Sequence, residues 1–157
     1  MKDMMVIAGA NGFMGLVLVD YFKTHYNVHT ITRKPLSIEG TTNHLWDGKT
    51  LGEWAKCIDG ADVLINLAGR SVNCRYNEKN KQEIFDSRTH STRVLGEAIV
   101  KAKHPPKVWL NSSTATIYRH AEDRQRHLAF AEQAQEPPHA GARAVLVERL
   151  HAHVARR

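Results

Sequence analysis

The chain alternates short apolar runs with longer stretches in which apolar residues recur every three or four positions. Short runs of this kind are typical of buried strands, and the longer stretches are typical of helices. Strands are expected at residues 4–8, 28–31, 44–47, 62–69 and 107–110. Helices are expected at residues 13–22, 50–58 and 77–102. The alternation predicts the α/β class, with a doubly wound parallel sheet.

Two of the expected helices have recognisable ends. Thr50 and Glu53 have the spacing of a capping box, which predicts that the second helix begins there. Gly60 is expected to end that helix, and Pro105 and Pro106 end the region of the third.

Three glycines follow the first predicted strand at equal spacing, and a helical pattern follows them at once. Gly9 permits a tight turn, Gly12 lets a pyrophosphate approach the backbone, and Gly15 lets the helix lie close to the sheet. The free N–H groups and the dipole at the helix start favour an anion. The pattern therefore predicts a dinucleotide phosphate loop, the alternative being a structural strand-to-helix turn.

Basic residues stand at the end of the second predicted strand. An acidic residue about 20 positions after the glycines would bind the ribose 2′-hydroxyl of NAD, whereas Arg suits the 2′-phosphate of NADP. This chain has Thr32, Arg33 and Lys34 there, and no acid. The residues favour NADP over NAD, the alternative being two solvated basic side chains.

Small and polar residues follow the later strands. Ala68 and Gly69 would let a nicotinamide ribose lie against the backbone, the alternative being an ordinary glycine turn. The run Asn111 to Thr114 leaves the last strand at its carboxyl end, where open α/β sheets bind ligands. Arg88 lies inside the apolar stripe of the longest helix, so it either turns toward cofactor oxygens or belongs to an interface.

Composition narrows the class of protein. The chain has 157 residues, enough for one domain, with 42% hydrophobic and 24% charged residues. Its net charge is +6, but the basic residues are scattered and no aromatic platform accompanies them, which argues against nucleic-acid binding. No apolar run has the length of a membrane span, and no secretory signal is visible, so a cytoplasmic location and free thiols at Cys57 and Cys74 are expected.

Six motifs in consistent order resemble the extended branch of the short-chain dehydrogenase/reductase superfamily, and within it the NAD(P)-dependent epimerase/dehydratase-like family. The likeness covers residues 3 to about 123. The motifs are Gly9-x-x-Gly12-x-x-Gly15, Thr32-Arg33, Trp46-Asp47, Asn66-Leu67-Ala68-Gly69, Lys81-x-x-Ile84-x-x-Ser87-Arg88 and Ser112-Ser113-Thr114 through Tyr118. The resemblance implies a Rossmann fold, bound NADP and a carbonyl or sugar-nucleotide substrate.

The resemblance also implies roles for individual residues. Leu67 and Ala68 would line the cofactor, Glu83 and Arg88 would contact it, and Thr114 would be a substrate-polarising hydroxyl. Together with the residue patterns, this gives a cofactor site of Gly9, Asn11, Gly12, Phe13, Met14, Gly15, Thr32, Arg33, Leu67, Ala68, Gly69, Glu83, Arg88 and Ser112. The catalytic candidates are Ser113, Thr114 and Tyr118.

The chain departs from the resemblance in two respects. Extended members are about twice as long, and their second half carries the substrate lobe. They also place a Lys four residues after a catalytic Tyr, whereas Glu122 follows Tyr118 here and no Lys occurs after Lys107. We therefore expect an NADP-binding oxidoreductase fragment with impaired or no turnover. The alternative is a non-catalytic dinucleotide-binding or redox-sensing module.

Residues 119–157 differ in composition from residues 1–118. They contain nine Ala, seven Arg and five His but no Lys, Asn or Ile, whereas the preceding residues contain ten Lys and eight Asn. The codons of Lys, Asn and Ile are AT-rich, whereas those of Ala and Arg are largely GC-rich. We therefore expect a reading-frame shift near Arg124. We predict a Rossmann domain at 1–118 and an atypical tail, helical or poorly ordered, at 119–157.

Two further expectations concern what the chain binds. His151 and His153 have no third ligand placed nearby, so no metal site is predicted. The edge beside the predicted strand at 107–110 is expected to be open, which would favour self-association.

Overall fold

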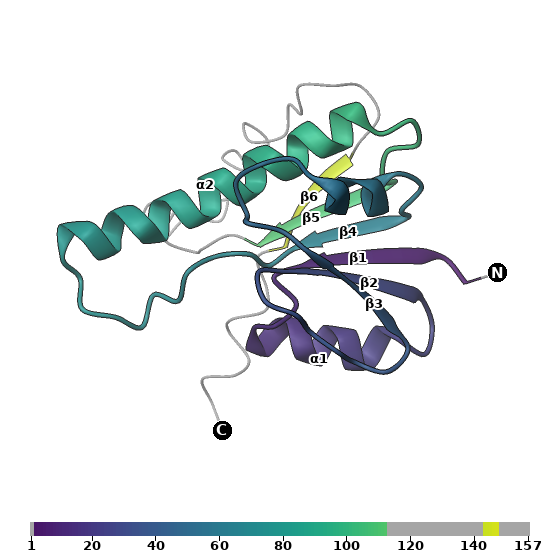
Figure 1. The fold of residues 1–157 in the computed structure, drawn as a ribbon, viewed down its shortest axis with the longest axis horizontal. Coiled ribbons are helices and arrows are strands. Elements are labelled where there is room, and N and C mark those ends of the chain that lie inside the picture. Colours follow the sequence, from purple (N-terminus) through teal and green to yellow (C-terminus); the bar gives the residue numbers. More distant parts are fainter. Residues whose placement is uncertain (1, 113–142, 148–157) are drawn as a thin grey trace, which may run out of the picture.

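A computed structural model describes residues 2–112 and the backbone of residues 143–147 (Figure 1). Its elements follow one another in the order expected of a βαβ protein. They are β1 (Met4–Ala8), α1 (Phe13–Phe22), β2 (Asn27–Thr32), β3 (Thr41–Leu45), the 3₁₀ helix η1 (Glu53–Ile58), β4 (Val63–Asn66), α2 (Glu78–Lys101), β5 (Val108–Ser112) and β6 (Arg143–Val147).

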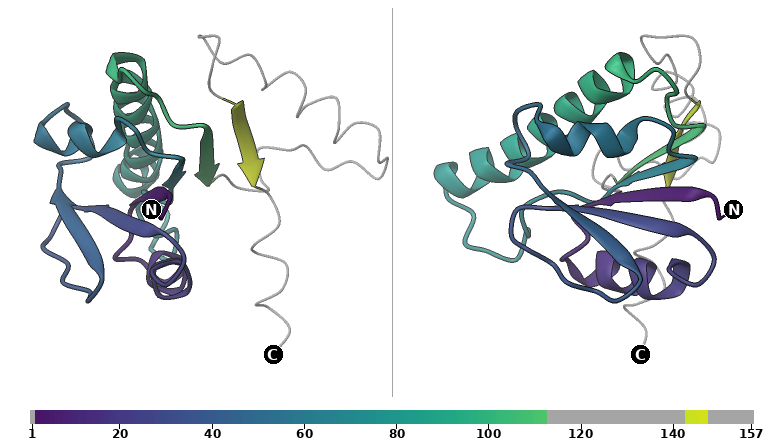
Figure 2. Two further views of the ribbon diagram at one scale, coloured as in Figure 1. Left: turned by 90° about the vertical axis from the view of Figure 1, so that its right-hand side faces the viewer. Right: turned by 45° about the vertical axis from the view of Figure 1, so that its right-hand side comes forward.

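The strands form one parallel sheet in the order β3-β2-β1-β4-β5-β6. The helix after β1 lies on one face of this sheet, while η1 and the helix after β4 lie on the other (Figures 1 and 2). The chain therefore changes faces between β1 and β4, which confirms the doubly wound Rossmann arrangement. In such sheets, a ligand crevice forms where the connections diverge to opposite faces.

Each face of the sheet has its own apolar core. Val6, Leu64 and Leu95 belong to the core shared with η1 and α2, and Met5 and Ile7 to the core shared with α1. Consecutive residues of β1 thus point to opposite faces, and both faces are covered by helices. This two-sided burial explains why β1 and β4 read as continuous apolar runs rather than as alternating ones.

The helices begin and end close to their predicted positions, and α1 matches its expected range. Asn77 caps α2 by accepting a hydrogen bond from the Asn80 amide at 2.8 Å, and Ala102 is the C-terminal cap. The third strand begins earlier than expected, at Thr41, because its backbone pairs with β2 from Val28 onward. Hydrogen bonding to a neighbouring strand set this boundary, and the apolar pattern did not reveal it.

The predicted capping box is wrong. The N-cap of η1 is Gly52, which makes no side-chain capping bond, and Glu53 pairs with Lys56 instead. The Thr50 hydroxyl donates to Asp47 at 2.7 Å, so it serves the preceding turn rather than the helix.

One described segment of the tail corrects two predictions. Residues 143–147 form strand β6, where we expected a helical or poorly ordered tail, and they pair in parallel with β5 from Arg143↔Val108 to Val147↔Ser112. The run Ala144-Val145-Leu146-Val147 contains β-branched residues that suit a strand. Because β5 pairs with β4 on one side and β6 on the other, its expected open edge does not exist. The remainder of the tail lies outside the described residues.

Candidate functional site

The turn after β1 depends on Gly9, for two separate reasons. Its φ is +78°, in the left-handed region, and a Cβ there would stand 2.8 Å from backbone atoms of Leu67 and Ala68. The Gly9 amide donates to the Ile31 carbonyl at 2.9 Å. The turn is therefore pressed against the end of β4 and bonded to the end of β2.

Gly12 and Gly15 differ in the space around their backbones. A Cβ at Gly12 would meet only the Gly9 carbonyl oxygen, at 3.5 Å, and Gly12 is exposed. A Cβ at Gly15 would lie 2.5 Å from the carbonyl oxygen of Ala10. The predicted close approach at Gly15 is therefore real, but its neighbour is the loop and not a strand of the sheet.

The first turn of α1 offers backbone donors. Gly12 is the N-cap, and it supplies no side-chain capping bond. Because the first amides of a helix have no intrahelical acceptor, Phe13, Met14 and Gly15 present N–H groups at the carboxyl edge of the sheet. These amides and the helix dipole favour a bound anion.

The end of β2 holds Arg33 beside the glycine loop. Asn43 of β3 donates to the Thr32 hydroxyl at 2.8 Å, and that hydroxyl donates to the Lys34 carbonyl at 2.7 Å. Thr32 is therefore fully engaged in shaping the turn that carries Arg33. The Arg33 guanidinium is exposed and forms no ion pair with any residue of the described part of the chain.

Asp47 organises the turn after β3. Its carboxylate accepts hydrogen bonds from the Lys49 amide at 2.7 Å, the Thr50 amide at 2.8 Å and the Thr50 hydroxyl. These bonds, the Thr50 amide first, lower the pKa of Asp47 to about 2. Arg93 of α2 donates to the Lys49 carbonyl at 3.5 Å, which ties this turn to α2.

Buried Asn66 positions the end of β4. Its amide nitrogen donates to Asn111 of β5 at 2.7 Å, and its amide oxygen accepts from the Ala68 backbone at 3.0 Å. Thr92 of α2 also donates to Asn111, at 3.2 Å. One polar network therefore joins β4, β5 and α2 directly beneath the segment from Leu67 to Gly69.

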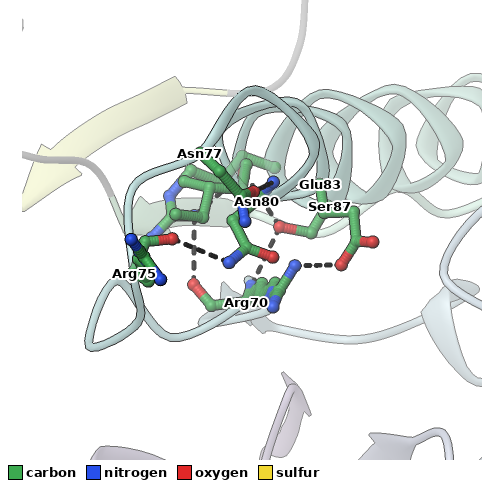
Figure 3. Close-up of polar contacts among 8 residues, drawn as sticks. Arg70, Arg75, Asn77, Asn80, Glu83 and Ser87 are labelled. Atoms are coloured by element: carbon green, nitrogen blue, oxygen red, sulfur yellow. Dashed lines mark hydrogen bonds and ion pairs between the residues drawn. The ribbon is translucent and has the colours of Figure 1, made fainter.

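The loop from Gly69 to Asn77 is bonded along its length to the start of α2 (Figure 3). The Arg70 amide donates to the Ser87 hydroxyl at 2.9 Å, and the Arg70 guanidinium pairs with Glu83. Further along, Asn80 donates to the Arg75 carbonyl at 2.7 Å. These contacts fix the loop as one wall of the site.

The four strand ends and α2 enclose an open cavity of 370 Å³, within the usual range for small-molecule sites. Its lining includes Gly9 and Gly12 of the glycine loop and the cations Arg33 and Lys49, which form no ion pair with any described residue. Its walls are Gly9, Asn11, Gly12, Thr32, Arg33, Trp46, Asp47, Gly48, Lys49, Leu67, Ala68, Gly69, Arg70, Glu83, Asp86, Ser87, His90 and Ser91.

Most of the predicted cofactor residues lie together in this cavity, and five do not. Phe13, Met14 and Gly15 form the first turn of α1 and are not among the residues that line the cavity. The Phe13 side chain is 71% exposed to solvent. Arg88 instead donates to the carbonyls of Arg70 and Ile84, at 3.2 and 3.0 Å, so it supports the loop wall. Ser112 is exposed at the end of β5, outside the cavity.

The catalytic candidates Ser113, Thr114 and Tyr118 lie outside the described residues, as do His151 and His153.

Both cysteines are described and both are free, and burial raises the pKa of Cys57 to about 12. Within residues 2–112, no cluster of three or more His, Cys, Asp or Glu side chains converges as metal ligands would. None of the described helices is long and apolar enough to cross a bilayer.

Sequence reasoning missed part of the wall. Lys49 and its neighbours were not assigned, although the rule that ligands meet the carboxyl ends of strands applies to β3 as well. Asp86, Ser87, His90 and Ser91 recur at helical spacing along one side of α2, a signal that the sequence contained. Arg70 had no sequence signal, because its place depends on Glu83.

Comparison with known proteins matches the chain to one family model over most of its length. The sequence model described as "NAD dependent epimerase/dehydratase family" matches residues 5–152. The chain is similar to the bovine epimerase family protein SDR39U1, at 30% identity over 118 residues, and to an epimerase family protein of Staphylococcus epidermidis, at 31% over 117 residues. These alignments cover 73% and 72% of this chain but only 37% and 38% of the relatives.

Solved structures agree with the sheet topology. The human epimerase family protein SDR39U1, isoform 2, solved with NADPH, has a TM-score of 0.70 and 27% identity. That comparison covers 92% of this chain and 52% of the human one. MoeE5 in complex with UDP-glucuronic acid and NAD has a TM-score of 0.65 at 22% identity, which supports the fold alone.

Proposed function

Because the chain belongs to the NAD-dependent epimerase/dehydratase family, we propose that it binds NADP at the carboxyl edge of its sheet. It would form the cofactor-binding part of an oxidoreductase that acts on sugar-nucleotide or other carbonyl substrates. The observation that carries the proposal is one cavity shared by the glycine loop and by Arg33. A dinucleotide has anionic groups that would engage both.

The pyrophosphate belongs at the glycine loop. Gly12 has no neighbour other than the Gly9 carbonyl oxygen within 4 Å of its would-be Cβ, so the backbone is open to close approach. The free amides of the first turn of α1 would donate to phosphate oxygens, and the helix dipole adds to this attraction. The small residues Ala68 and Gly69 would leave room for the nicotinamide ribose.

Arg33 supports NADP over NAD. The turn formed by Thr32 and Asn43 holds it at the end of β2, and no described acidic side chain neutralises it. A guanidinium can donate two parallel hydrogen bonds to a phosphate, whereas a ribose hydroxyl offers it no charge. Lys49 lines the same cavity and adds a second positive charge.

Titration of the full chain with NADPH and NADH tests this preference. Arg33→Ala is expected to weaken NADPH binding by about tenfold or more and to leave NADH binding nearly unchanged. Lys34→Ala is the matched control, because Lys34 is also basic and exposed but does not line the cavity. If both variants lose NADPH affinity equally, or if neither loses any, Arg33 does not have the role assigned to it.

We propose that these 157 residues alone turn over little or no substrate. Tyr118 is followed four residues later by Glu122, whereas the resemblance calls for a Lys at that position to assist a catalytic Tyr. Adding UDP-glucose to the chain saturated with NADPH or NADP⁺ is expected to produce neither an epimerised sugar nucleotide nor a change in nicotinamide absorbance. Substrate-dependent oxidation or reduction of the nicotinamide would show that the chain is a working enzyme.

A further inference from the structure

One side of α2 presents polar residues to the cavity, and His90 is the only ring among them. Asp86, Ser87, His90 and Ser91 all line the cavity. One turn further along the helix, Arg93 reaches the carbonyl of Lys49, in the turn that follows β3. His90 therefore lines the cavity one turn of α2 before the residue that bonds the turn after β3, and Arg33 and Lys49 line the same cavity.

The two ring nitrogens of His90 have different surroundings. Nδ1 is buried and has no hydrogen-bond partner among the described residues, whereas Nε2 is not among the buried unpartnered atoms. A buried N–H without an acceptor is rarer and costlier than a buried acceptor without a donor. The neutral ring therefore carries its proton on Nε2, which leaves an N–H donor on the side chain that lines the cavity.

The neighbouring groups indicate what such a donor would meet. Arg33 and Lys49 supply positive charge to the cavity, so a phosphate has partners there already. A single neutral donor suits an uncharged acceptor, and the adenine ring carries such acceptors on its edges. We infer that His90 donates a hydrogen bond from Nε2 to a ring nitrogen of adenine, an inference that rests on the proposed NADP site.

Affinity measurements on three variants of the full chain test this inference. His90→Phe keeps the ring and removes the donor, and it is expected to weaken NADPH binding by about tenfold. His90→Gln places an amide N–H near the position of Nε2 and is expected to bind within about threefold of the wild type. His104→Phe makes the same substitution at an exposed histidine outside the cavity, and it should leave affinity unchanged.

Two fragments locate the contact along the dinucleotide. His90→Phe should weaken binding of adenosine 2′,5′-bisphosphate by the same factor as NADPH and should leave reduced nicotinamide mononucleotide unaffected. Loss on the nicotinamide fragment instead would overturn the assignment to adenine. If His90→Gln binds as poorly as His90→Phe, the ring fills space and the hydrogen bond is absent.

The outcomes for NADPH separate this inference from the proposed function. Equal affinity of the wild type and His90→Phe overturns the adenine contact and leaves the NADP site standing. Failure of the wild type to bind NADPH overturns the proposed function and this contact with it. If His90→Phe lowers the unfolding midpoint without ligand, the two fragments decide: equal loss of affinity for both overturns the contact, and loss for adenosine 2′,5′-bisphosphate alone supports it.

Discussion

Gly9, Gly12 and Gly15 stand at equal spacing, but their backbones have different surroundings. Gly9 needs both a positive φ and room beside Leu67 and Ala68, and Gly15 needs room beside Ala10. Gly12 needs neither for folding, because its φ of −81° is ordinary and its surroundings are open. We propose that its lack of a Cβ lets a pyrophosphate approach the backbone.

A matched pair of glycines separates the two demands made on Gly9. Gly40 has nearly the same φ, +80°, but has nothing within 4 Å of a would-be Cβ. Gly40→Ala should cost about 1–2 kcal/mol of unfolding free energy, from the backbone conformation alone. Gly9→Ala should cost clearly more, about 3 kcal/mol or above, because two backbone segments must also move apart.

Urea unfolding of both variants measures this difference. Nearly equal losses of unfolding free energy in Gly9→Ala and Gly40→Ala would show that the turn tolerates a Cβ beside β4. In that case the close approach of the glycine loop to Leu67 and Ala68 would not be a constraint on the fold.

The sequence predicted the position of a single residue correctly where that residue lies next to the end of a predicted strand. The glycine loop, Thr32 and Arg33 lie within or beside a strand end, so the strand pattern places them in the cavity. The sequence did not predict the carbonyl partners of Arg88, those of Arg70 and Ile84, because the path of a loop sets the first of them. Nothing in the spacing along α2 reveals where that loop runs.

At the scale of elements, apolar periodicity placed every described helix and every strand before β6. The errors lie where hydrogen bonds override periodicity. Thr41 enters β3 because its backbone pairs with β2, and Thr50 serves the turn of Asp47 instead of capping η1. The segment Arg143–Val147 shows the same effect, since strand pairing with β5 replaces the expected helical or poorly ordered tail.

The cross-strand contact of His29 and His44 shows what element pairing adds to sequence. The two imidazoles stack between β2 and β3, with 2.9 Å between Nδ1 of His29 and Nε2 of His44. Burial lowers the pKa of both rings, and the charge of His44 lowers that of His29 further. Fifteen residues separate them in the chain, and only the strand register brings them together.

At the scale of the whole molecule, the strand order determines where the cavity forms. The chain leaves β1 toward one face and β4 toward the other, so the loops after these neighbouring strands diverge and leave a crevice. The curated relatives to which the chain is similar are much longer, and the alignments span 37–38% of their length. The described residues nevertheless bring the glycine loop, Arg33 and α2 around one cavity.

The NADPH affinity of Gly12→Val, measured together with its unfolding free energy, tests the central claim most directly. Because the backbone at Gly12 is extended and open, this variant should change the unfolding free energy by less than about 1 kcal/mol. Its branched side chain would occupy the space of the pyrophosphate, so NADPH should bind at least tenfold more weakly. Unchanged NADPH affinity in a folded Gly12→Val protein would contradict a phosphate site at this loop.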